Sequence, residues 1–73
     1  MDMSNLGSIE LVGKDKQVYT DGTTRYIYSF QGLTKDDFSK LPILYDMGAG
    51  SSCLFLDGNY ARFHAKTQQW KLI

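Results

Sequence analysis

The strongest constraint on the fold is an Asp-Gly pair, Asp57-Gly58, which separates two stretches typical of β-strands. An Asp-Gly pair between two such runs favours a tight hairpin, because these residues tolerate the positive φ angles of short turns. The run before it, residues 51–56, is apolar and β-prone. In residues 60–65 after it, an alanine or phenylalanine alternates with a side chain that carries a polar group. The pattern therefore predicts an antiparallel hairpin closed by residues 57–59.

The predicted strand after this turn has two different faces, because side chains at period two share a face. One face carries Ala61, Phe63 and Ala65, and the other carries Tyr60, Arg62 and His64. The polar run 66–69 predicts a second turn, and residues 70–73, which open with the large apolar ring of Trp70, predict a short closing strand. Residues 51–73 are thus expected to form a three-stranded antiparallel meander.

The first half of the chain repeats the order strand, Asp-Gly turn, strand around Asp21-Gly22. Residues 8–12 predict a first strand and residues 13–16 a charged turn. Residues 17–20 and 23–30 predict the two arms of a second hairpin.

One short helical segment is expected between the two hairpins, over residues 34–41. Thr34 is a suitable N-cap, and the two aspartates that follow suit the positive end of a helix. Pro42 ends the segment, because proline pushes the residue before it away from the helical ψ angle. Residues 42–46 are expected to be extended, with an edge strand as one interpretation.

These elements predict a single, mainly β domain over residues 1–73, either a small antiparallel β-barrel or a two-sheet sandwich, with one short helical turn. Residues 1–7 are expected to form a flexible N-terminal arm, or a strand that orders on a partner. A chain this short buries only about 60% of its unfolded surface, so small domains often need a disulfide, a metal or self-association. One cysteine and one histidine provide neither an internal disulfide nor a structural zinc site, which points to association.

The charge balance and hydropathy of the chain restrict its partners. Eight basic and eight acidic residues balance, whereas a binder of duplex DNA or of an anionic membrane carries a basic excess. No apolar run approaches the roughly 20 residues of a membrane span. The N-terminal residues also lack the basic and apolar segments of a signal peptide. We therefore expect synthesis in a cytoplasm and no membrane partner, and the charge balance does not favour nucleic acid.

Cys53 and His64 are the obvious candidates for a nucleophile and a base. In the predicted hairpin they lie within one register step of opposite positions, so a Cys-His dyad is one interpretation. The alternative is a small buried cysteine and an exposed strand histidine, which is how free cysteines usually occur. Neither an oxyanion motif nor a third orienting group accompanies the pair. We therefore expect no enzyme activity, no catalytic residues, no cofactor and no metal.

The predicted partner-binding residues are an aromatic row and its basic neighbour: Arg25, Tyr26, Tyr28 and Phe30. The three rings share one face of the predicted strand because they recur at period two. Rings on a sheet beside a basic groove bind single-stranded nucleic acid, but this chain has no basic excess. Such rings also form the inner face of small β-structures, and exposed tyrosine and arginine are favoured in protein interfaces. The core and the interface interpretations both stay open at this point.

The segment 41–73 also resembles a family pattern. It carries Leu41-Pro42 before a glycine-containing lead-in, then Gly50-Ser51-Ser52, Asp57 after a short apolar run, Tyr60 and finally Trp70. In this order, these residues resemble small virion-module (head-region) structural proteins of tailed phages that infect Gram-positive bacteria. The chain departs from that pattern at residues 57–59, where the family's threonine is absent, and at Phe63-His64, which replaces a more apolar pair.

This resemblance implies a structural protein of a bacteriophage virion, either a capsid-associated decoration protein or a head-module component. It implies protein–protein binding to a capsid or other virion protein, as a homo-oligomer or as many copies bound to a lattice, and it carries no catalytic residues. Two alternatives stand beside it. One is a small phage-encoded inhibitor or regulator that binds a host protein, and the other is a small barrel that binds single-stranded nucleic acid.

Overall fold

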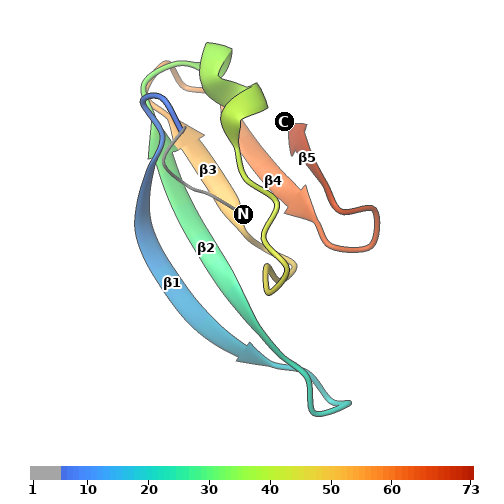
Figure 1. The fold of residues 1–73 in the computed structure, drawn as a ribbon. Coiled ribbons are helices and arrows are strands. Elements are labelled where there is room, and N and C mark those ends of the chain that lie inside the picture. The colour runs from blue at the N-terminus through green and yellow to red at the C-terminus, as the bar shows by residue number, and fades with distance from the viewer. Residues whose placement is uncertain (1–5) are drawn as a thin grey trace.

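Five strands form one mixed sheet in the order β1-β2-β3-β4-β5 in the computed structural model, which describes residues 6–73 (Figure 1). The strands are β1 (Glu10–Val18), β2 (Thr24–Gly32), β3 (Ser52–Phe55), β4 (Tyr60–His64) and β5 (Gln69–Leu72), and a 3-10 helix, η1 (Lys35–Lys40), lies between β2 and β3. The prediction of a mainly β fold with one helical turn is therefore confirmed. Most of the predicted N-terminal arm, residues 1–5, lies outside the described part of the chain.

The sheet contains one parallel pair, β2 with β3, while β1-β2, β3-β4 and β4-β5 are antiparallel. The prediction of an entirely antiparallel structure is wrong at this pair. A parallel neighbour needs a crossover connection, and residues 33–51, which include η1, supply it. The described strands form one open sheet with β1 and β5 at its edges, so the predicted barrel or two-sheet sandwich is not confirmed within the chain.

Both predicted Asp-Gly turns are confirmed, because Gly22 and Gly58 adopt positive φ angles of +88° and +93°. The charged segment 13–16, which was predicted as a turn, is instead part of β1. A register shift between Leu11 and Gly13 absorbs the irregularity as a bulge, so the strand continues along its partner β2.

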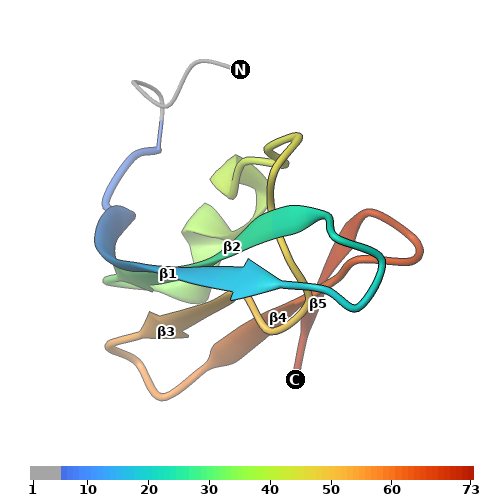
Figure 2. The ribbon, with the colours of Figure 1, turned by 90° about the horizontal axis from the view of Figure 1, so that it is seen from below.

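The hydrophobic core lies on one face of the sheet, beneath the crossover and the chain that leads into β1 (Figure 2). The strands contribute the buried side chains of Tyr28, Phe30, Cys53, Phe55, Ala61 and Phe63, and the covering segments contribute Leu6, Ile9, Leu41 and Met47. The Phe30 ring stacks on Tyr28, with centroids 6.1 Å apart, and meets Trp70 edge-on at 6.0 Å. Phe30 thereby ties β2 to the far edge of the sheet.

The predicted helical segment is present as η1, one residue shorter at each end. Thr34 has an extended backbone and its side chain accepts a hydrogen bond from the N–H two residues on, as an N-cap does. Residues 42–46 do not form an edge strand, and the next residue, Met47, meets β2 through an isolated bridge to Tyr26.

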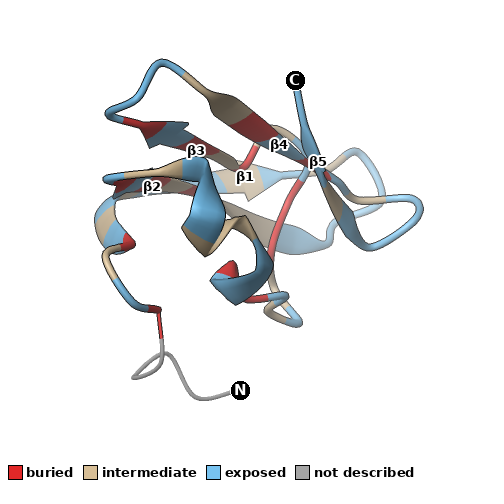
Figure 3. Cartoon of the chain, turned by 90° about the horizontal axis from the view of Figure 1, so that it is seen from above, coloured by how far each residue is buried: buried red, intermediate tan, exposed pale blue. Residues whose placement is uncertain are grey.

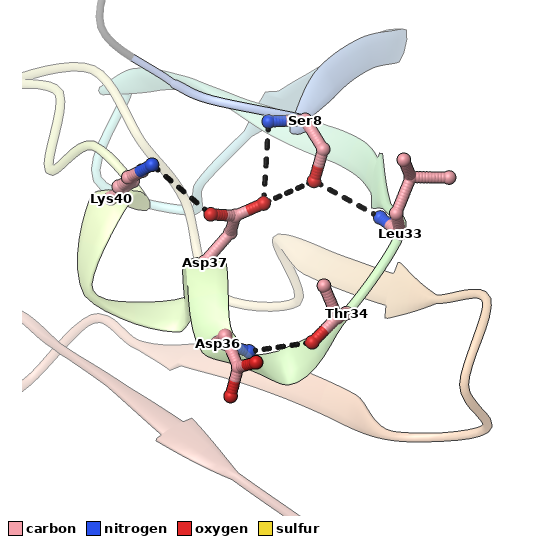
Figure 4. Close-up of polar contacts among 6 residues, drawn as sticks. All are labelled: Ser8, Leu33, Thr34, Asp36, Asp37 and Lys40. Atoms are coloured by element: carbon pink, nitrogen blue, oxygen red, sulfur yellow. Dashed lines mark hydrogen bonds and ion pairs between the residues drawn. The ribbon is translucent and has the colours of Figure 1, made fainter.

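A polar network fastens η1 to the start of β1 (Figure 4). The Asp37 carboxylate accepts hydrogen bonds from the N–H (3.3 Å) and the hydroxyl of Ser8, and it pairs with Lys40 at 3.2 Å. The Ser8 hydroxyl oxygen in turn accepts the Leu33 N–H at 3.2 Å. These bonds hold the end of β2, the helix and the entry to β1 together.

A buried serine bridges the short interval in which β2 has no strand partner on the side opposite β1. The crossover reaches β2 at Met47, several residues before β3 begins. Between these two points the Tyr28 N–H donates to the Ser51 hydroxyl oxygen at 3.0 Å, and that hydroxyl donates to the Gly48 carbonyl at 2.9 Å. The Ser51 carbonyl also accepts the Phe63 N–H at 2.9 Å. Ser51 thus links β2 to β4 through side chain and backbone.

Candidate interaction surface

The structure separates the two residues of the predicted Cys-His dyad. Cys53 pairs with Ala61 and is fully buried on the core face, whereas His64 pairs with Gln69. His64 is exposed on the opposite face, because alternation places it one position out of phase with the buried residues of β4. Burial also raises the pKa of the Cys53 thiol to about 11, which disfavours the thiolate that a nucleophile needs. The dyad interpretation is therefore wrong.

The aromatic row is largely part of the core. Tyr28 and Phe30 are 5% and 2% exposed, so these rings have almost no surface to offer a partner. Tyr26 and Arg25 are partly exposed at the far end of β2. The Lys14 ammonium lies 4.4 Å from the centroid of the Tyr26 ring. Of the predicted partner-binding residues, only Tyr26 and Arg25 keep accessible surface.

Internal contacts occupy the polar atoms around this row. The Tyr28 hydroxyl donates to Asp46 Oδ1 at 2.8 Å, and Arg25 Nη1 donates to the Tyr45 carbonyl. Desolvation, followed by this bond to Asp46, raises the pKa of Tyr28 to about 12. The row therefore stabilises the fold at the end of the first hairpin and has few free polar groups for recognition.

The other face of the sheet, called here the outer face, is covered by no described segment (Figures 2 and 3). Strand register assigns to it Glu10, Asp15 and Gln17 of β1, Arg25, Ile27, Ser29 and Gln31 of β2, Ser52 and Leu54 of β3, Tyr60, Arg62 and His64 of β4, and Gln69 and Lys71 of β5. The predicted alternation of residues 60–64 is confirmed here, since Ala61 and Phe63 are buried behind this face.

Three leucines form an exposed apolar patch at one end of the outer face. Leu33, Leu54 and Leu56 are 60%, 52% and 79% exposed. Leu54 and Leu56 line a shallow hollow with Gln31, and Leu33 and Leu56 line an adjoining hollow with Glu10. Contiguous exposed apolar surface on a folded domain marks a contact site. We call these three side chains the leucine patch.

The signal for the leucine patch was present in the run 51–56. Leu54 and Leu56 alternate there with Cys53 and Phe55, and the core takes the latter two. A continuous apolar run has no polar phase, so it does not show which of its faces is buried.

Charges divide the outer face into two halves. Glu10 and Asp15 lie on β1, and Arg62 and Lys71 lie on β4 and β5. All four side chains are exposed. Arg25 of β2 is only partly exposed, and its guanidinium donates to the Tyr45 carbonyl. The β1 edge of the face is therefore acidic, the edge formed by β4 and β5 is basic, and β3 with Leu54 runs between them.

Residues 6–73 contain no group of three or more His, Cys, Asp or Glu side chains placed to hold a metal ion. Within the same residues, no helix reaches the length and apolarity needed to cross a membrane. No protein-family model, no curated protein and no solved structure matches this chain.

Proposed function

We propose that this protein is a phage structural protein, a capsid-associated decoration or head-module component that acts by protein–protein binding in a multi-copy assembly. The observation that supports the proposal is the outer face, a sheet surface with an exposed leucine patch and no covering layer. An open sheet face can remain in water, but exposed leucines on it favour a partner, because burial of apolar surface is the main driving force of protein association. The resemblance of residues 41–73 to head-region proteins supplies the virion as the setting.

The partner in this proposal is a capsid or other virion protein. Binding through a sheet face suits a lattice, because the strands hold the contacting side chains at fixed spacings and little order is lost on docking. Many weak sites on one particle also add up to firm attachment. Arg25, partly exposed, lies on the outer face at the start of β2, and the partly exposed Tyr26 lies on the opposite face and supplies a second, smaller contact area.

The test is mass spectrometry of purified particles from the phage that encodes this chain. We expect the protein in many copies per particle, and its absence from particles would overturn the proposal. A matched pair of variants then locates the contact. Leu54→Asp, on the outer face, should reduce the number of copies bound to the particle. Val18→Asp, at a similarly exposed position of β1 on the opposite face of the sheet, should leave that number unchanged.

The two alternatives are outcomes of parallel experiments on the same protein. A stoichiometric complex with one host protein in pull-downs, together with absence from particles, would support a host regulator. A mobility shift of single-stranded oligonucleotides at low salt would support nucleic-acid binding, since Arg62 and Lys71 lie beside the Tyr60 ring on the outer face.

A further inference from the structure

We infer that the outer face binds a second copy of this chain, face to face, to form a two-sheet sandwich across a two-fold axis parallel to β3. This inference rests on the proposed binding role of the outer face and identifies its first partner. The two-sheet arrangement expected from the sequence then arises between two chains instead of within one.

The strand order makes the outer face suitable for this symmetry. Because β3 is the middle strand, a two-fold axis along it places β1 of one copy over β5 of the other, and β2 over β4. Leu54 of β3 lies at the axis, so it packs against Leu54 of the second copy. Aligned sheets pack in this way about 10 Å apart, with side chains interdigitating between them.

The charges are complementary in this arrangement. The acidic side of one copy faces the basic side of the other, and the contact occurs twice by symmetry. The opposite choice is a two-fold axis that runs across the strands. It would place the basic side of one copy on the basic side of the other, and like charges that face each other in an interface oppose binding. The distribution of charge therefore selects the axis parallel to the strands.

The register gives this charge contact a specific geometry. Lys71 of β5 pairs with Arg62 of β4. Across the sheet, this row of paired residues continues through Ser52 of β3 and Ser29 of β2 to Gly13 of β1. Lys71 of one copy therefore faces Gly13 of the other, which has no side chain of its own, beside the exposed Val12 of the bulge. Glu10 and Asp15 flank that glycine on the outer face, so both carboxylates are within reach of one ammonium group.

The surface that a dimer must bury is a small share of the surface of the molecule. A stable interface buries about 800 Å² on each partner, which is about a sixth of the 4783 Å² exposed by the described residues. Leu54, Tyr60 and Ile27 supply apolar area on the inner strands of the face, the rest of the leucine patch extends it at one end, and charged side chains lie on both sides.

The test uses two charge-reversed variants of the isolated full chain in analytical ultracentrifugation. We expect the wild type to sediment as a dimer at micromolar concentrations. Arg62→Glu with Lys71→Glu makes both sides acidic, and Glu10→Lys with Asp15→Lys makes both sides basic. Each variant alone should dissociate, with a dissociation constant raised about 100-fold or more. An equimolar mixture of the two should form a heterodimer, because each acidic side again meets a basic side.

Matched controls separate this effect from a general loss of stability or a change in net charge. Lys16→Glu with Lys35→Glu changes the net charge as much as the first variant but lies on the other side of the sheet, so it should leave the dimer intact. A monomeric wild type, a dimer unaffected by either reversal, or a mixture that stays monomeric would overturn the inference. None of these outcomes affects detection of the protein in particles, so the two proposals fail separately.

Discussion

The hydroxyl of Ser51 takes the place of a backbone acceptor in the gap between the crossover and β3. It is fully buried and serves both the Tyr28 N–H and the Gly48 carbonyl. A buried N–H that loses its acceptor keeps the full cost of its desolvation. Ser51 is therefore a structural residue, although the sequence pattern showed it only as part of an apolar run.

Ser51→Ala should lower the free energy of unfolding by about 1–3 kcal/mol, because it leaves the Tyr28 N–H without a partner. Chemical denaturation followed by circular dichroism measures this difference. The neighbouring Ser52→Ala, at a partly exposed position on the outer face, should change stability by no more than about 0.5 kcal/mol. Equal effects of the two variants would contradict the role assigned to Ser51.

The buried Cys53 thiol and Tyr28 hydroxyl, which lose a proton at high pH, make the stability of the fold sensitive to alkaline pH. Burial raises the pKa of Cys53 from 9.0 to about 11, and burial with the Asp46 bond raises the pKa of Tyr28 from 10.0 to about 12. Because both groups ionise more easily in the unfolded chain, their stabilisation is complete below pH 9 and is lost as the pH rises to 12.

We therefore expect the free energy of unfolding to fall progressively across this alkaline interval. Urea denaturation at a series of pH values measures the slope. Cys53→Ala should make the slope shallower and leave the contribution of Tyr28. A stability that stays constant through the interval would show that neither group is held in its neutral form by the fold.

At the scale of elements, the position of η1 depends on the Asp37 network more than on its own six residues. Short 3-10 segments have poor internal hydrogen bonds and depend on external contacts. The hydrogen bonds from Ser8, followed by the contact with Lys40, also lower the pKa of Asp37 below 3.8. The stabilisation from this carboxylate is therefore present above that pH and is lost as the pH falls through the pKa of the folded state.

Asp37→Asn should speed amide hydrogen exchange at Ser8 and Leu33, because it weakens the acceptor that orders both. It should also reduce the loss of stability of the protein below pH 3.8. Asp36→Asn is the matched control, since its carboxylate points away from the network (Figure 4). Unchanged exchange in Asp37→Asn, or the same increase in both variants, would contradict this account.

Local chemistry predicted the elements well where one residue type was decisive. The Asp-Gly turns and the Thr34 cap lie where expected. A positive φ angle favours glycine, and the unpaired N–H groups at the start of a helix favour a side chain that accepts a hydrogen bond. The charged segment 13–16 was misassigned as a turn, because exposed strand edges also carry charge. Residues 42–46 failed as a strand because the crossover makes only one bridge to β2.

At the scale of the whole molecule, the core depends on Phe30, which joins β2 to β5 through Trp70. Phe→Ala substitutions in cores cost about 3–5 kcal/mol, and small domains have only about 5–15 kcal/mol of stability. Phe30→Ala should therefore lose most of the cooperative thermal transition in circular dichroism. Tyr26→Ala, in the same row but partly exposed, should keep it. Loss of the transition in both variants would show that the whole row is equally buried.

The edges of the sheet favour association through its face. β1 is a long edge strand, but it carries Lys14, Asp15 and Lys16 in succession. Charged residues on an edge strand oppose pairing with a further strand. The outer face has the exposed leucine patch, so burial there yields more free energy than extension of the sheet at β1.

The sequence by itself determined the two Asp-Gly turns, the strands of the C-terminal meander, the helical cap and the alternation in β4, because each depends on residues close together in the chain. Only the tertiary structure decided that β2 and β3 run parallel, that Cys53 and His64 lie on opposite faces, and that Tyr28 and Phe30 are buried. These outcomes depend on where the crossover of residues 33–51 lies. Its path covers one face of the sheet and leaves the other open, and no local pattern specifies that choice.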